Sequence, residues 1–481
     1  MSNKNSDTFN NKVTEFVMEI SKGLTVYEQL NAFCQAADLA PLEDNLDYIS
    51  DVFNQTHAVV QQGGKTWVVE REQDHKCNIG YTFSQAQQKR QLYANLNFEY
   101  IEHDKTKQAN CFNLWMKSPS RNTYQGVIFD PSNNSSSIFL NLWKGFNVDA
   151  VEGDDKLDRI MWHLLNIVCC GNQDHFYYLL AWMAQIIQQP EKKTGVCLVL
   201  KSDSRGTGKS TVSVLLEKML GEYAMRIQDS KHLMGAFNSH LANKLLVTLE
   251  EAFWAGSAKD AGKFRTLITE STLTLEAKGR DAFEIDSYHR YLLCTNNAWV
   301  VPATQNERRF FVLEVSEDKA QDKEYFTALY RDINSNKAIG QLFNFLLNYD
   351  IEPFDLRKAP LTRALQEQIM ESLPHEAEWF QKVLEDGEMS DGKQVFRFDG
   401  VKKIPKSSFF DSYIEFCNDM SIAGFDRKSP RALGRYLSVT LAVVKDGGKV
   451  QITGGSRANC YETQPLEVMQ AIFDEHYRYQ E

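Results

Sequence analysis

The 481-residue sequence lacks the features that mark secreted and membrane-spanning proteins. Its first twelve residues are polar and contain no apolar signal-peptide core. Its longest apolar stretch, Tyr177 to Ile187, is too short to cross a bilayer, which needs about 20 residues. We therefore expect a soluble protein that works in the cytoplasm of a bacterial or other host cell and makes no membrane contact.

Cysteines in metal-binding pairs are also missing. The nine cysteines are scattered, and only Cys169 and Cys170 lie together, with His163 and His175 nearby in the sequence. Adjacent residues of a helix point about 100° apart, so neighbouring thiols rarely reach one ion. We expect a buried helix here rather than a metal site, and free thiols that suit a reducing compartment.

The chain has no excess of positive charge and no internal repeat. With 53 Lys and Arg against 64 Asp and Glu, the net charge is -11. Any contact with nucleic acid must therefore come from local basic surfaces, and a protein that passively coats DNA is disfavoured. One low-complexity patch, residues 133–137, is interpreted as a loop.

The length and the apolar patterns predict several structural units. Strand and helix patterns alternate from Val196 to Tyr349, which indicates an α/β unit with a mostly parallel sheet. We expect an N-terminal α+β region of unknown role (1–125), a linker and helical collar (126–190), the α/β unit (191–352), a helical linker (353–392) and a winged-helix-like domain (393–481).

The strongest chemical signal is a glycine-containing loop between an apolar strand, residues 196–200, and a helical stretch from Thr211. Its sequence, Lys-Ser-Asp-Ser-Arg-Gly-Thr-Gly-Lys-Ser, ends at Ser210 and has the form of a P-loop. There, backbone amides cradle phosphates, the lysine reaches the β- and γ-phosphates, and the hydroxyl binds Mg²⁺. We predict that ATP is bound by six consecutive residues, with Ser210 as a magnesium ligand: Gly206, Thr207, Gly208, Lys209, Ser210 and Thr211.

The loop departs from the P-loop pattern at one position, where Asp203 stands in place of the first glycine. Aspartate tolerates a left-handed backbone better than most residues, so we expect the loop still to close.

Two later strands end in polar side chains. Residues 244–249 run into Glu250 and Glu251, and residues 291–295 run into Asn296. We predict that Glu250 holds the magnesium ion and Glu251 activates the attacking water, with the reverse assignment left open. Asn296 is predicted to sense the γ-phosphate or this water; the alternative is an Asx turn that ends the strand.

A pair of arginines, Arg308 and Arg309, leads directly into another apolar strand. A guanidinium keeps its charge and binds phosphate oxygens in a bidentate manner. Arg308 is therefore our candidate for an arginine finger, and Arg309 for a second phosphate or interface contact. The alternative is two solvated arginines before an edge strand.

Basic residues gather in two further places. Residues 273–285 predict a hairpin whose tip carries Lys278 and Arg280, which could grip single-stranded DNA or form an ordinary solvated turn. From residue 393 to 457, twelve Lys and Arg face six Asp and Glu, a local balance of +6. A predicted helix there, 431–441, turns Arg431 and Arg435 outward, which favours a winged helix that contacts DNA; a packing domain with a basic face is the alternative.

The order of these motifs resembles that of superfamily 3 helicases, and more closely the helicase part of phage, plasmid and poxvirus-type primase–helicases. The resemblance covers about residues 125 to 350 and is carried by Phe129-Asp-Pro131, Asn141-Leu-Trp-Lys-Gly-Phe146, Phe237-Asn238, Glu276-Ala-Lys-Gly279 and Glu307-Arg-Arg-Phe310. It implies an AAA+-like motor that forms a hexameric ring with ATP sites between subunits. It also implies hairpins that line the channel and 3′-to-5′ travel on single-stranded DNA.

We therefore expect an ATP- and Mg²⁺-dependent helicase that acts on single-stranded and forked DNA for a phage, plasmid or other mobile element. The N-terminal region shows no convincing acidic triad of a primase, so a separate primase or replication protein is a candidate partner. Two other interpretations remain: an ATP-switched origin-binding initiator that does not unwind DNA itself, and, with less support, a packaging or defence ATPase.

Overall fold

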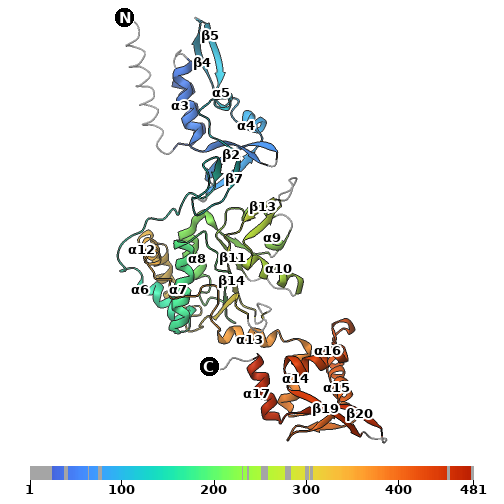
Figure 1. The fold of residues 1–481 in the computed structure, drawn as a ribbon. Coiled ribbons are helices and arrows are strands. Elements are labelled where there is room, and N and C mark those ends of the chain that lie inside the picture. The colour runs from blue at the N-terminus through green and yellow to red at the C-terminus, as the bar shows by residue number, and fades with distance from the viewer. Residues whose placement is uncertain are drawn as a thin grey trace.

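The α/β unit forms around a five-stranded sheet in the computed structural model (Figure 1). The structure describes residues 24–36, 42–62, 64–73, 79–103, 105–229, 231–235, 238–250, 258–276, 283–297, 303, 307–451 and 456–477. Within these residues, no helix is both long enough and apolar enough to span a bilayer.

All five strands of the central sheet are parallel, which confirms the sheet predicted from the alternating pattern. Their order is β10-β11-β14-β9-β15. The bounds are β9 Cys197–Lys201, β10 Ala224–Ile227, β11 Leu246–Glu250, β14 Arg290–Thr295 and β15 Phe310–Glu314. Because the strands are parallel, loops that follow them meet at one edge of the sheet, and segments that precede them meet at the other.

Helices cover both faces of this sheet, because successive side chains of a strand point to opposite sides. Leu198 and Leu200 pack into a core on one face, and Cys197 and Val199 into a core on the other. The first face is covered by α7 (Gln173–Gln188), α8 (Thr211–Leu220), α11 (Lys323–Ile333) and α12 (Asn336–Leu347). The second is covered by α10 (Ala258–Thr269), α13 (Arg363–Glu371) and the antiparallel hairpin β12 (Thr272–Leu275) and β13 (Phe283–Asp286).

Short elements complete this unit and join it to the preceding chain. Within it lie η2 (Gly221–Tyr223), α9 (Lys231–Met234) and η3 (Ser239–Leu241). Before it lie the parallel pair β7 (Gly126–Ile128) and β8 (Phe139–Asn141), helix α6 (Asp158–Trp162) and a π-helix, η1 (His163–Val168). Helices α6, η1 and α7 occupy the region predicted to be helical, and α7 ends at Gln188, two residues before Pro190.

The N-terminal region combines a mixed sheet with helices and has a core of its own around Phe53, Phe112 and Trp115. Its strands are β1 (His57–Gln62), β2 (Lys65–Gln73), β3 (Ile79–Ser84) and β6 (Thr123–Tyr124) in the order β3-β2-β1-β6, plus the hairpin β4 (Asn97–Glu102) and β5 (Lys105–Asn110). Its helices are α2 (Val26–Ala36), α3 (Leu42–Asn54), α4 (Ala86–Leu92) and α5 (Cys111–Lys117). It lies at the opposite end of the molecule from the C-terminal domain (Figure 1).

The C-terminal domain packs its helices, a two-stranded sheet and a three-stranded sheet around a separate core. Its three-stranded sheet has the order β18-β20-β19, from β18 (Lys403–Pro405), β19 (Val444–Gln451) and β20 (Arg457–Thr463). The other elements are α14 (His375–Asp386), β16 (Glu388–Ser390), β17 (Val395–Arg397), α15 (Lys406–Asp419), η4 (Gly424–Asp426), α16 (Pro430–Arg435), the π-helix η5 (Tyr436–Thr440) and α17 (Leu466–Tyr477).

The glycine pair Gly447-Gly448 lies inside β19. The register shifts between Asp446 and Lys449, so the two glycines form a bulge. A Cβ on Gly447 would lie 2.9 Å from the Cys460 Sγ of the partner strand, and Gly448 has a φ of +76°. Glycine is therefore needed here for a close approach between strands rather than for a turn.

The segment 353–392, predicted to be a helical linker, contains two helices that pack on different cores. Leu365 and Ile369 of α13 belong to the core under the parallel sheet, whereas Trp379 and Phe380 of α14 belong to the C-terminal core. Pro374 precedes α14 and separates the two helices.

Candidate nucleotide-binding site

A cavity of about 240 Å³ lies at the edge of the sheet where β9, β11 and β14 end. It brings together seven of the residues predicted from the sequence, Gly206, Thr207, Gly208, Lys209, Ser210, Glu250 and Asn296, with Arg205, Cys294 and Thr295. Thr211 begins α8 and is fully buried behind the loop. The loop, the Glu250 strand and the Asn296 strand therefore converge, as the rule for parallel strands predicts.

Two glycines give the loop its shape. Gly206 and Gly208 have φ values of +75° and +92°, in the left-handed region that favours glycine. Asp203, at the position of the first glycine of the pattern, does not have a positive φ and does not need the left-handed backbone that aspartate tolerates. The loop closes instead with Asp203 exposed and the two later glycines making the turn.

His163 and Phe326 hold the loop from outside the sheet. A Cβ on Gly208 would lie 2.6 Å from Cε1 of His163 and 2.9 Å from Cε1 of Phe326. The Nε2 of His163 lies 3.4 Å from the Gly208 carbonyl oxygen, and its Nδ1 lies 2.8 Å from the Tyr325 hydroxyl. Because a carbonyl only accepts, Nε2–H donates to it and Nδ1 accepts from the tyrosine. No motif in the sequence pointed to His163 in this position.

Lys209 is oriented toward Asn296. Its Nζ donates to Asn296 Oδ1 at 2.6 Å and to the Ser204 carbonyl at 3.2 Å, and it also contacts the Ser202 hydroxyl. The ammonium group is thus placed among oxygen atoms that a phosphate could replace. The predicted sensor and the predicted phosphate lysine are direct neighbours.

Glu250 pairs with Arg226, a residue of β10 that sequence reasoning did not find. Arg226 Nη1 donates to Glu250 Oε1 at 2.6 Å, and its Nε donates to Glu217 Oε1 at 2.6 Å. Its Nη2 reaches the hydroxyl of Ser213, which in turn donates to the Ser210 carbonyl. Arg226 therefore links the predicted magnesium ligand to the helix that follows the loop. An isolated arginine in a short strand carries no motif signal.

Three predicted residues lie outside the described part of the chain: the second glutamate, Glu251, and the hairpin cations, Lys278 and Arg280. The hairpin itself is present. In it, β12 and β13 are antiparallel, with Thr272 opposite Asp286 at one end and Leu275 opposite Phe283 at the other.

Arg308 lies at the edge of the sheet opposite the cavity. It precedes β15, and the next residue, Arg309, accepts a hydrogen bond at its carbonyl from the N–H of Cys197, where β9 begins. Arg308 therefore lies near the start of β9, and the glycine-containing loop follows its end. The five residues of β9, about 16 Å of extended chain, separate the two. Arg308 therefore cannot reach the nucleotide cavity of its own chain.

The two neighbouring arginines have different surroundings. Arg309 Nη1 pairs with the buried carboxylate of Glu307 at 3.3 Å, whereas the side chain of Arg308 is exposed. Arg309 therefore forms an ion pair within its own chain, whereas Arg308 extends into solvent.

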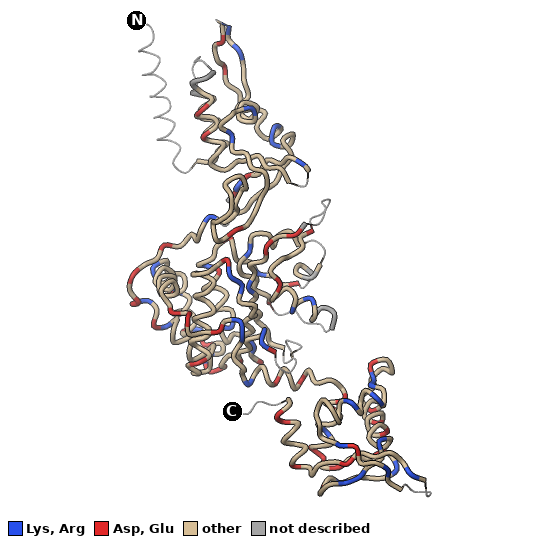
Figure 2. The backbone as a smooth tube through the Cα atoms, in the orientation of Figure 1, with Lys and Arg blue, Asp and Glu red and all other residues tan. Residues whose placement is uncertain are grey.

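In the C-terminal domain, Arg431 and Arg435 are exposed on α16, and Leu433 between them is buried. Basic and acidic residues are interspersed along the described parts of the chain, so neither end of the molecule is uniformly basic (Figure 2).

Acid is expected to destabilise the protein below about pH 6.5. Burial lowers the pKa of His57 to about 3 and those of His163 and His289 to about 4. In the unfolded chain, histidine has a pKa of about 6.5. Below that pH the unfolded chain binds more protons than the folded protein. The contribution of these histidines to the free energy of unfolding is therefore fully present above pH 6.5 and decreases toward pH 4. At pH 5 each histidine should cost on the order of 2 kcal/mol relative to pH 8.

Thermal unfolding followed from pH 8 to pH 5 measures this effect. The variant His289→Asn should show a smaller decrease in Tm over this range than the parent protein. A Tm that stays constant between pH 7 and pH 5 would contradict the burial of these neutral imidazoles.

The fold and the site define an α/β protein with a glycine-containing loop and a cavity at the carboxyl edge of a parallel sheet. Residues 200–309 match the model of a protein family of unknown function, DUF5906. The DNA primase-polymerase of Nitratiruptor phage NrS-1 is 26% identical to this chain over 254 residues, which is 50% of the chain and 35% of that protein. The chain thus spans about a third of the length of this relative.

Solved structures of the C-terminal region of NrS-1 share the fold. One apo structure gives a TM-score of 0.60 at 19% identity, over 87% of this chain and 99% of that one. The A form of the apo region gives 0.59 at 18% identity, over 86% and 99%. The likeness extends well beyond the parallel sheet, because it covers most of the present chain.

Proposed function

We propose that this chain is an ATP-driven DNA helicase, similar to superfamily 3 helicases, that serves the replication of a phage, plasmid or other mobile element. It would bind ATP and Mg²⁺ at the P-loop, assemble into a homo-oligomeric ring of six copies, and travel 3′ to 5′ on single-stranded DNA. A separate primase or replication protein in the cytoplasm of the host would be its partner. The similarity to a phage DNA primase-polymerase supports a role in phage DNA replication.

One observation carries the proposal: the P-loop and Arg308 lie on opposite edges of one parallel sheet. A nucleotide at the P-loop would meet Lys209, Glu250 and Asn296 of its own chain but no Arg308. A ring of copies, each facing the next in the same direction, brings the Arg308 edge of one copy to the nucleotide of its neighbour. Such a site hydrolyses ATP only in the assembly, which suits a ring-shaped motor.

In the cis part of the site, Lys209 would neutralise the β- and γ-phosphates, and Ser210 with Glu250 would hold Mg²⁺. These donors fit a hard cation, since both supply oxygen. Glu250 would exchange its contact with Arg226 for the ion. The ion, when bound, would supply positive charge to the phosphate oxygens. Asn296 would orient the γ-phosphate or the attacking water, and Glu251 would take the proton from that water.

The proposal is tested by unwinding of forked DNA in the presence of ATP and Mg²⁺. Wild-type protein is expected to separate a substrate with a 3′ single-stranded tail and to leave one with only a 5′ tail intact. Lys209→Ala protein should unwind neither, because the phosphate cation is gone. Equal unwinding of the two tails would overturn the assigned polarity, and equal activity of the Lys209→Ala protein would overturn the motor.

A second candidate function is an ATP-switched initiator that binds origin DNA and assembles on it without unwinding. The exposed arginines of α16 favour it, since the C-terminal domain has the helix order and β18-β20-β19 sheet expected of a winged helix. DNA-stimulated ATP hydrolysis without strand separation, together with sequence-specific duplex binding, would support this function over the helicase.

Under either function, we expect Arg431 and Arg435 to contact DNA phosphates. The double variant Arg431→Ala/Arg435→Ala should bind duplex DNA more weakly regardless of sequence. The slope of log affinity against log salt should fall by roughly 2, one for each lost phosphate contact. Fluorescence anisotropy at several salt concentrations measures the slope, with Arg397→Ala, an exposed arginine of the same domain, as control. An unchanged slope would leave these arginines as part of a solvated face.

A further inference from the structure

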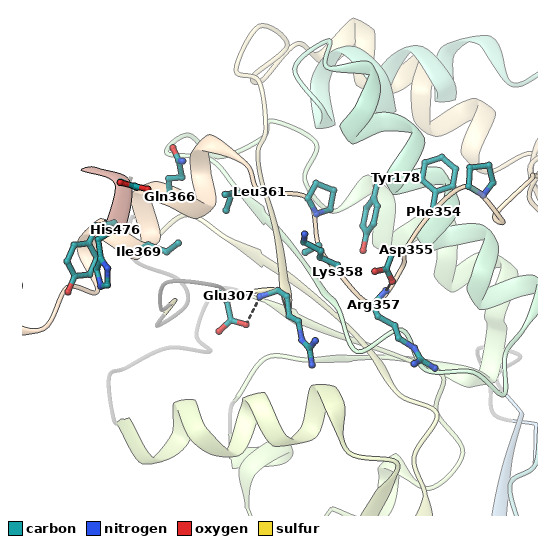
Figure 3. A pocket seen from close by; sticks show the side chains of 16 residues that line it. Tyr178, Glu307, Phe354, Asp355, Arg357, Lys358, Leu361, Gln366, Ile369 and His476 are labelled. Carbon is teal, nitrogen blue, oxygen red and sulfur yellow. Dashed lines mark hydrogen bonds between the residues drawn. The ribbon is translucent and has the colours of Figure 1, made fainter. Parts of the chain in front are cut away.

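Arg357 lies beside Arg308 at the edge of the sheet opposite the P-loop. The two arginines line the same two cavities, of about 640 and 1230 Å³. The smaller cavity is bordered by residues that precede β9, β14 and β15, and the larger by the loop 353–361 with α13 and the end of α17. Figure 3 shows the larger cavity, with Arg357 projecting from this loop on the side away from His476.

The loop is attached to the strand that carries Arg308. The N–H of Ala359 donates to the Arg308 carbonyl at 3.0 Å, and Ala359 is buried. Asp355 fixes the turn before it, since its Oδ1 accepts from the N–H of Arg357 at 3.2 Å and its carbonyl accepts from Lys358. The two arginines are therefore positioned by backbone hydrogen bonds, and their guanidinium groups extend from a fixed base.

The other charged groups of the smaller cavity are Lys193 and the carboxylates of Glu191 and Asp286, and of these Lys193 is held within the fold. Lys193 uses all three ammonium protons on the Leu267 and Glu270 carbonyls and the Ser287 hydroxyl. Glu307, which lines the larger cavity, accepts from Arg309 and the backbone. Within the described residues, by contrast, neither Arg308 nor Arg357 has a side-chain hydrogen bond or ion pair, and both are exposed.

Two unpaired guanidinium groups that line the same cavities can be stabilised together by an anion with several oxygen atoms. We propose that Arg308 and Arg357 form one site for the triphosphate of a nucleotide bound to a second copy of this chain, and that Arg357 is a second arginine acting in trans. The inference rests on the proposed function. The ligand comes from outside the chain because β9, about 16 Å long, separates this edge from its own P-loop.

The test compares ATP hydrolysis by wild-type protein with that of Arg357→Ala, Arg357→Lys and the control Arg363→Ala. Arg363 is a surface arginine of α13, 89% exposed and paired only with Glu367 of the same helix. Arg357 is also exposed, so none of these substitutions should disturb the fold. We expect kcat of Arg357→Ala to fall by roughly tenfold to a hundredfold, the loss of one charge-assisted contact, with partial recovery in Arg357→Lys.

Mixing distinguishes action in trans from action in cis. Arg357→Ala and Glu251→Gln proteins should each be weak alone and regain turnover when mixed, because some sites then combine an intact P-loop side with an intact arginine edge. No recovery on mixing would overturn the trans assignment. Turnover of Arg357→Ala equal to that of Arg363→Ala would overturn the inference alone, since wild-type hydrolysis would still stand.

A DNA phosphate is the competing ligand for the same two arginines. Hydrolysis is therefore measured without DNA as well as with it. If Arg357→Ala lowers DNA affinity but leaves DNA-free turnover unchanged, the site binds DNA and the inference is wrong. If the wild-type protein hydrolyses no ATP in either condition, the proposed function fails and the inference fails with it.

Discussion

Arg308→Ala protein is expected to bind ATP as the wild type does and to hydrolyse it about a thousandfold more slowly or worse, the range measured for lost arginine fingers. Binding should persist because the nucleotide cavity lies at the other edge of the sheet. Turnover should fall because the charge that develops on the γ-phosphate loses its partner. Fluorescent-nucleotide binding and phosphate release, measured on one preparation, separate the two quantities.

Mixing two variants tests whether Arg308 acts on the nucleotide of a neighbouring copy. Arg308→Ala supplies an intact P-loop side, and Glu251→Gln supplies an intact Arg308, so a mixture should hydrolyse ATP faster than either protein alone. Arg331→Ala, an exposed arginine of α11, serves as the control for removal of a surface charge. If mixing restores nothing, Arg308 does not act across an interface between copies.

Gly208→Ala is expected to lower ATP affinity by roughly tenfold to a hundredfold, because a lost hydrogen bond to a charged phosphate costs about 1.5–3 kcal/mol. The new methyl group would lie 2.6 Å from His163 and 2.9 Å from Phe326, both of which are held by packing, so the loop has to move. The backbone amides that should cradle the phosphates move with it. Isothermal titration with a non-hydrolysable ATP analogue measures the loss.

Gly145→Ala is the matched control for backbone strain. Gly145 has a φ of +83°, close to the +92° of Gly208, but a Cβ there would meet nothing within 4 Å. Both substitutions should cost about 1–2 kcal/mol for the left-handed alanine, and only Gly208→Ala should also lose nucleotide. Full ATP affinity in the Gly208→Ala protein would contradict this prediction. It would show that the side chains of His163 and Phe326 move aside and leave the loop in place.

Much of the site could be anticipated because its parts are local. A strand, a glycine-containing loop and a helix follow one another within residues 196–220, and only short-range geometry is needed to interpret them as a P-loop. Glu250 and Asn296 each end a strand, and parallel strands bring such ends to one edge. Glu250 and Asn296 could therefore be predicted to lie close together although they are 46 residues apart in the sequence.

Contacts that depend on packing between distant elements left no such pattern. His163 reaches the Gly208 carbonyl through a π-helix that precedes the sheet by about thirty residues. Arg226 reaches Glu250 across two adjacent strands. The bulge at Gly447-Gly448 also depends on such a contact, since the neighbour that requires glycine there, Cys460, belongs to the other strand.

The sequence by itself determined the parallel α/β unit, the glycine-containing loop and the strand ends around it, because hydrophobic period and glycine chemistry act over a few residues. Only the tertiary structure decided which of two adjacent arginines is presented to solvent and on which edge of the sheet. Arg308 and Arg309 are equivalent in the sequence, but the buried carboxylate of Glu307 pairs with Arg309. The backbone hydrogen bond from Ala359 then brings a third arginine, Arg357, beside Arg308, and only the folded chain places the two side by side.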